Sequence, residues 1–146
     1  MNIFVTNSCP KLSARYLDNK RVIKMALEST QMLCSALNLA GGTTPYKTAH
    51  KNHPCSIWAR QSRANWLWLY DHAIALCNEY TLRYGKIHKC ESILNNINTL
   101  VELLPIGQLT PFVNCTTHKN ISNVFIAYQL ELNDKWDKDK ISPKWS

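Results

Sequence analysis

The sequence predicts a mainly α-helical, compact single domain with an extended N-terminal segment. Its 146 residues suit one domain, and 45% of them are hydrophobic, including five tryptophans, which is enough to bury a core. Long segments repeat apolar residues at the helical period, and glycines or prolines separate these segments. With no internal repeat or low-complexity tract, the chain is expected to form one helical bundle over residues 1–146.

Helix ends are expected where proline favours a first turn or where glycine or proline stops the helical pattern. The expected elements, in chain order, are an extended segment or short strand at 3–5, a helix from about 11 or 18 to 39, a loop at 41–53, a long helix at 54–84, a helix at about 89–104, a turn-rich segment at 107–120, and a last helix at 121–136.

Charge and cysteine content restrict the partners and the compartment. The formal charge of +7 and the pI near 9.2 favour a polyanionic partner such as nucleic acid, a nucleotide or an acidic membrane surface. No apolar run approaches the roughly 20 residues that span a bilayer, and no signal peptide is evident, so a cytosolic protein is expected. The six cysteines are scattered without CxxC spacing, which predicts reduced core residues.

A basic and aromatic loop leads into the expected long helix. Pro54 favours the first helical turn, which places Asn52 or His53 at its cap, where free N–H groups attract anions. The loop is therefore a candidate phosphate cradle, although a solvated loop that only caps a helix remains an alternative. A second cluster of the same chemistry, from Glu79 to Lys89, lies at the far end of that helix.

Two helices each carry a narrow polar stripe on an otherwise apolar surface. Lys20, Lys24 and Glu28 share one helical face. Because helices that are apolar nearly all round are buried, the two stripes are expected to converge on one cavity below the loop at 50–53. The alternative is a core network in which Glu28, His72 and Arg83 satisfy one another. The stripe of the long helix contains Gln61, Asn65, His72, Glu79 and Arg83.

These residues support three chemistries. Lysines and arginines could hold a phosphate while histidines and Glu28 act as acid and base without a metal. Glu28 and an amine could instead perform glycosylase and lyase chemistry, with Tyr46 and Trp58 stacking on an extruded base. A zinc site built on His50 and His53 is a weaker alternative, because a single HxxH pattern in a loop is unspecific.

The chain resembles a widespread family of uncharacterised tailed-phage proteins. The resemblance rests on the start MNIFV, the run at 16–33, the motif HKNHPCSIW at 50–58 and the segment at 76–89. It implies a phage protein in the cytoplasm of the infected bacterial host. The last helix departs from that family, because residues 125–129 stand where an Arg-rich and Tyr-rich segment is usual.

A second resemblance is to bacterial and phage pyrimidine-dimer DNA glycosylases, and it implies a glycosylase-like all-α fold. Members use an N-terminal α-amine that forms a Schiff base with the sugar, together with one glutamate, for which Glu28 has the matching spacing. Asn2 disfavours removal of the first residue, so the amine would be that of Met1. The resemblance rests on Tyr16, Leu17, Asp18, Lys20 and Glu28, followed by Tyr46, Lys47, Asn52, His53 and Pro54.

Two function classes follow. The favoured one is a phage anti-defence protein that binds a phosphorylated nucleotide, such as a cyclic nucleotide or an NAD-derived immune signal, and could cleave it as a phosphodiesterase-type hydrolase. The alternative is a DNA glycosylase and abasic lyase. Neither metal nor cofactor is expected. The predicted catalytic residues are Glu28, His50 and His53, and the predicted ligand-binding residues are Lys20, Lys24, Tyr46, Lys47, Lys51, Asn52, Trp58, Arg60, Asn65, His72, Glu79, Arg83, Lys86 and His88.

Overall fold

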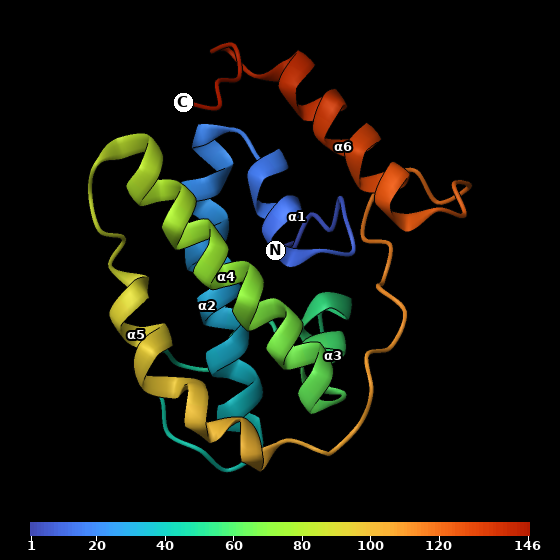
Figure 1. The fold of residues 1–146 in the computed structure, drawn as a ribbon. Coiled ribbons are helices and arrows are strands. Elements are labelled where there is room, and N and C mark those ends of the chain that lie inside the picture. The colour runs from blue at the N-terminus through green and yellow to red at the C-terminus, as the bar shows by residue number, and fades with distance from the viewer.

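The computed structural model describes residues 1–146 and confirms a mainly α-helical domain without strands (Figure 1). Helices α2 (Asn19–Leu39) and α4 (Arg63–Tyr84) cross at the centre, and the other elements surround them. No helix combines the length and the apolar character that a membrane span requires. The surrounding elements are α1 (Pro10–Tyr16), α3 (Pro54–Arg60), α5 (Cys90–Ile97), the 3-10 helix η1 (Asn98–Leu103) and α6 (Val124–Lys138).

The first predicted helix is two helices, because both expected start points are used. Pro10 opens α1 in its first turn, and α2 begins after Asp18. Leu17 and Asp18 have extended backbones that separate the two helices. Asp18 is buried at this break, where its carboxylate accepts hydrogen bonds from Arg21 and from the Trp136 indole.

The prediction of one continuous helix over 54–84 is wrong, because the chain breaks at Ser62. Ser62 is fully extended and N-caps α4, and its hydroxyl oxygen accepts the backbone N–H of Asn65 at 3.1 Å. The Asn65 side chain in turn donates to the Trp58 carbonyl at 2.8 Å, at the end of α3. The break is therefore built from hydrogen bonds that compensate for the interrupted helical ladder.

The later helices also have shorter bounds than the sequence pattern predicts. The helix expected at 89–104 is α5 followed by the tighter η1, and it ends at Leu104, whose extended backbone precedes Pro105. The helix expected at 121–136 begins only after Asn123, whose side chain accepts the N–H groups of Phe125 and Ile126. A local side-chain cap thus overrides the apolar periodicity at the start of α6.

The N-terminal segment is extended, as expected, and forms no strand. Ile3, Phe4 and Val5 are all buried in the core. Phe4 has a left-handed φ of 57°, a conformation that costs a bulky residue about 1–3 kcal/mol. The Asn2 side chain accepts the N–H groups of Ile3 and Phe4 at 2.7 and 3.1 Å, and these bonds hold the turn.

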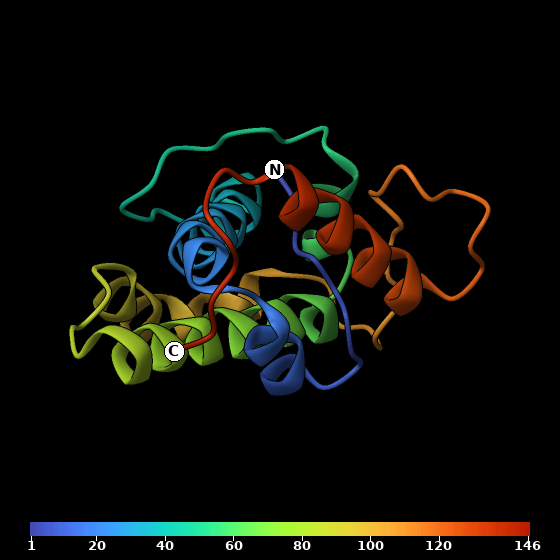
Figure 2. The same cartoon turned by 90° about the horizontal axis from the view of Figure 1, so that it is seen from above.

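Helix α6 packs over this N-terminal segment at the edge of the bundle (Figure 2). The Phe4 and Tyr128 rings meet edge to face, and the Gln129 side chain donates to the Thr6 carbonyl at 3.2 Å. Beyond α6, Asp139 forms two hydrogen bonds with Arg21 of α2, at 2.7 and 3.2 Å. The end of the chain is therefore joined to the start of α2 by an ion pair.

Replacing Arg21 with alanine should lower the free energy of unfolding by about 3–5 kcal/mol, because Asp18 and Asp139 would lose their shared buried cation. The matched control is Lys20→Ala, since Lys20 is mostly exposed and 3.7 Å from Asp139; its loss should cost less than about 1 kcal/mol. Urea denaturation of both variants measures the difference. Equal losses would show that the Arg21 network does not hold the C-terminal segment.

Candidate functional site

The N-terminal amine and the Glu28 carboxylate form an ion pair between the first residue and α2. The Met1 nitrogen lies 3.6 Å from Glu28 Oε1, and the Glu28 side chain is only 14% exposed. The exposed Lys24 places its Nζ 3.8 Å from Glu28 Oε2, an oxygen with no hydrogen-bond partner. The pair therefore lies just below the surface, and one oxygen of the Glu28 carboxylate accepts no hydrogen bond.

The Met1 amine is positioned by contacts on both sides of the N-terminal segment. The Asn2 side chain donates to the Cys115 carbonyl at 3.4 Å, in the long connection before α6. The Ser56 hydroxyl of α3 lies 3.4 Å from the Met1 sulfur. Helices α2 and α3 and the connection before α6 therefore all fix the first two residues.

His53 is the third group of this site and caps α3. Its Nδ1 accepts the backbone N–H of Cys55 at 3.1 Å. Burial lowers the pKa of His53, the positive charges of the Met1 amine and His50 lower it further, and the Glu28 carboxylate partly opposes them. The charges of Met1 and Glu28 thus act directly on a His53 imidazole that stays neutral at pH 7.

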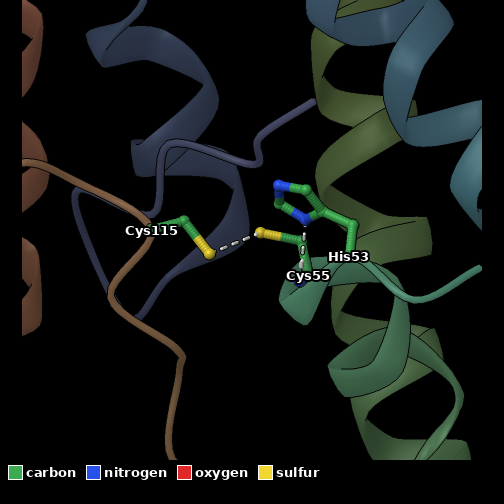
Figure 3. Close-up of side chains that lie close together, drawn as sticks. All are labelled: His53, Cys55 and Cys115. Atoms are coloured by element: carbon green, nitrogen blue, oxygen red, sulfur yellow. Dashed lines mark hydrogen bonds between the residues drawn. The ribbon is translucent and has the colours of Figure 1, made fainter. Parts of the chain in front are cut away.

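Two cysteines adjoin His53, as Figure 3 shows. The sulfur atoms of Cys55 and Cys115 are 3.3 Å apart and point toward each other beside the His53 imidazole. All six cysteines are free thiols, and the four at positions 34, 55, 77 and 90 are buried. The reduced core cysteines predicted from the sequence are therefore largely found, with this pair as the unexpected feature.

The basic loop before α3 is mostly a solvent-exposed segment. His50, Lys47, Lys51 and Asn52 are exposed. Arg60 donates to the Lys51 carbonyl at 2.6 Å, so its guanidinium ties the loop to α3. Tyr46 is half-buried with its hydroxyl 3.8 Å from the Cys90 sulfur. Because α3 has only seven residues, its start adds little to these cations as a phosphate cradle.

Several predicted ligand residues are structural. Trp58 is 1% exposed, donates to the Thr110 carbonyl and packs against Trp68 and Phe112, so it cannot stack on an extruded base. His72 is fully buried, with Nδ1 3.0 Å from the Pro10 carbonyl oxygen. Burial lowers its pKa to about 4.

The remaining helix-stripe residues also bond to their own surroundings. Asn65 bonds to Trp58 and Thr110, and the buried His88 lies 3.2 Å from the Ile23 carbonyl oxygen. Arg83 pairs with Glu79 at 3.0 Å and donates to the carbonyl of Leu17. The core network expected among Glu28, His72 and Arg83 is therefore wrong, since each has different partners.

The single cavity predicted from the two stripes is not formed. A cavity of about 390 Å³ lies between the start of α2 and the C-terminal tail, and of the stripe residues it includes only Lys20. A second cavity, of about 260 Å³, includes only Glu79. Lys24 and Lys86 project into solvent. The buried polar side chains form hydrogen bonds with backbone groups of neighbouring segments. They therefore line no common pocket for a nucleotide.

Sequence reasoning identified Glu28 and His53 but did not place the Met1 amine beside them. The resemblance to glycosylases supplied the only signal for that amine. Cys115 was missed, because its contact with Cys55 joins α3 to the connection before α6 across 60 positions. No local pattern in the sequence encodes that contact.

Comparison with known proteins adds one finding. A protein-family model described as pyrimidine dimer DNA glycosylase matches residues 1–92. The matched region includes Met1, Glu28 and His53, whereas Cys115 and α6 lie beyond it. No curated protein and no solved structure matches the chain.

The charges around His53 make a titration prediction. In the folded protein the His53 imidazole should titrate below its ordinary pKa of 6.5, and Glu28→Gln should lower that pKa further because it removes the one charge that favours the imidazolium. NMR titration of the imidazole carbon protons measures both shifts. The matched control Glu79→Gln should leave His53 unchanged, since Glu79 pairs with Arg83 instead. A His53 pKa unaffected by Glu28→Gln would place Glu28 outside the site.

Proposed function

The chain belongs to the pyrimidine dimer DNA glycosylase family, and from this premise we propose that it is a DNA N-glycosylase and abasic lyase. The observation that carries the proposal is the 3.6 Å contact between the Met1 amine and Glu28. An amine nucleophile beside a carboxylate is the minimal equipment for Schiff-base chemistry at a sugar carbon. The substrate class is DNA that contains pyrimidine dimers or abasic sites.

The reaction assigns one role to each group. The unprotonated amine attacks C1′ of the deoxyribose, and the bond from C1′ to the base breaks as the base leaves with its electron pair. The attached nitrogen then passes a proton to Glu28, the C1′–O4′ bond of the sugar ring breaks as O4′ takes up that proton, and a cationic Schiff base remains between C1′ and the amine nitrogen. Glu28 lies where its negative charge stabilises this cation, and its unpartnered Oε2 is free to accept a proton.

His53 suits the proton transfer that activates the amine. A protonated amine has no lone pair, so an adjacent neutral base is required. The lowered pKa of His53 keeps its imidazole neutral at pH 7, and the imidazole can accept a proton at Nδ1 if that nitrogen releases the Cys55 N–H. His53 also caps α3, which fixes the ring relative to the helix.

The surroundings of the pair suit a DNA backbone better than a small enclosed ligand. None of the three cavities includes Met1, Glu28 or His53. The exposed cations Lys24, Lys47 and Lys51 lie on α2 and the loop before α3, the elements that flank the pair, and the chain carries a net charge of +7. Exposed lysines bind phosphates by charge, which gives affinity that falls with salt.

The first test is covalent trapping. With a duplex that contains one abasic site, borohydride should convert the Schiff base into a stable cross-link at Met1, and mass spectrometry of the N-terminal peptide identifies the attached residue. Glu28→Gln should reduce the trapping rate by about 10²–10⁴-fold, because it keeps the shape but removes the charge and the proton acceptor. Glu79→Gln, another half-buried carboxylate in an ion pair, should trap at the unaltered rate.

Three outcomes of this experiment would contradict the proposal. The first is a cross-link through a lysine, and the second is an equal trapping rate in Glu28→Gln and Glu79→Gln. The third is the absence of any cross-link although the intact mass shows that the Met1 amine is unmodified. Acetylation of the amine should abolish trapping. A gel shift of the acetylated protein measures DNA binding, so loss of the nucleophile can be told apart from loss of DNA binding.

The second test separates the two roles of His53. His53→Asn keeps an acceptor that suits a helix N-cap, so the free energy of unfolding should change by less than about 1 kcal/mol. It removes the imidazole, so the trapping rate at pH 7 should fall by about 10²-fold or more. Chemical denaturation and single-turnover trapping measure the two effects. A rate unchanged at pH 7 would assign His53 to the cap alone.

A further inference from the structure

The thiols of Cys55 and Cys115 form a contact that joins two distant parts of the chain. Cys55 is the second residue of α3 and is fully buried, whereas Cys115 lies in the connection before α6 and is half-buried. Their sulfur atoms are 3.3 Å apart, with the Cys55 thiol as the donor (Figure 3). This is a direct hydrogen bond between two thiols.

We propose that Cys55 and Cys115 are a redox-active pair that closes to a reversible disulfide with a low-molecular-weight disulfide as oxidant. This site is independent of the proposed DNA chemistry and nothing in the family match assigns it, because Cys115 lies beyond the matched residues. The geometry supports it, since a disulfide needs about 2.05 Å between the sulfurs, and a closing motion of little more than 1 Å is within reach of side-chain rotation.

The surroundings favour the thiolate on one partner. The hydrogen bond from Cys55 lowers the pKa of Cys115, with help from Tyr128 and the positive charge of Lys119. The same contact and burial raise the pKa of Cys55. Cys115 is thus the more acidic and the more accessible thiol, which identifies it as the attacking sulfur.

The reaction balances with glutathione disulfide as the oxidant. The Cys115 thiolate attacks one sulfur of the oxidant, whose S–S bond breaks and releases one glutathione thiolate, leaving a mixed disulfide on Cys115. Cys55 then loses its proton to the released thiolate and attacks the Cys115 sulfur, which expels the second glutathione. The protein loses two electrons and two protons, and the oxidant becomes two thiols.

A metal site on the same residues fits less well. The donor atoms of His53, Cys55 and Cys115 all lie within 4.8 Å of one another. The 3.3 Å sulfur spacing is close to the roughly 3.7–3.8 Å that Zn–S bonds of about 2.3 Å impose in a tetrahedral site, so the objection to a metal lies in the imidazole. His53 Nδ1 accepts the Cys55 N–H, which leaves the proton of the neutral ring on Nε2, so neither nitrogen offers a free lone pair.

The test is oxidation of the native protein by glutathione disulfide, followed by intact-mass analysis and peptide mapping. We expect the mass to fall by two hydrogen atoms, a peptide linking Cys55 to Cys115, recovery with dithiothreitol, and a higher Tm because the cross-link closes a long loop. Cys115→Ser should show neither the mass loss nor the Tm rise. The matched control Cys9→Ser removes an unpaired half-buried thiol and should behave as the unaltered chain.

The same experiment can overturn the proposal. A stable glutathione adduct on Cys115 without the linked peptide, or oxidation that requires denaturant, would show that the sulfurs cannot close in the fold. Zinc binding is measured in the unaltered protein and in Cys115→Ser. If the unaltered protein binds one zinc ion, Cys115→Ser binds none, and adding zinc to the metal-free protein blocks its oxidation, the pair is a metal site. The main measurement is made on the unaltered chain. The linked peptide or the glutathione adduct can therefore be identified even if a variant does not fold.

Discussion

Burial of the N-terminal segment is the constraint on which the candidate site depends. Ile3, Phe4 and Val5 are each at most 4% exposed, and burying three such side chains contributes about 1.5–3 kcal/mol apiece. That gain takes the Met1 amine below the surface with them, where an unpaired charge would be costly. Glu28 supplies the opposite charge, so the packing that stabilises the bundle also assembles the pair.

The sequence predicted the helices better than their ends. Apolar periodicity identified α2 and α4, and Gly85, with its left-handed backbone, ended α4 as expected. The break at Ser62 was missed because the polar run at 60–63 contains no glycine or proline to mark a helix end. The cap is stabilised from outside the helix, where the Ser62 hydroxyl donates to the Gln108 carbonyl at 3.0 Å. A tertiary partner 46 positions away has no signature in the local pattern.

The sequence predicted which residue types form the candidate site, but it did not predict which of those residues lie close together. Glu28 and His53 were named from spacing and capping, and their surroundings support that choice. The polar stripes misled because a buried polar side chain needs only one partner, and a backbone carbonyl serves as well as a ligand. His72 and Arg83 each use one, from Pro10 and Leu17. Nucleotide binding, the phage source and the host compartment remain predictions.

The packing of α6 over the first residues has a consequence for how the protein matures. During synthesis residues 2–6 leave the ribosome more than 100 positions before their neighbours Cys115 and Gln129. The nascent chain therefore carries an apolar N-terminal segment without its cover, a state open to chaperones. Formation of α6 is the event that covers this segment.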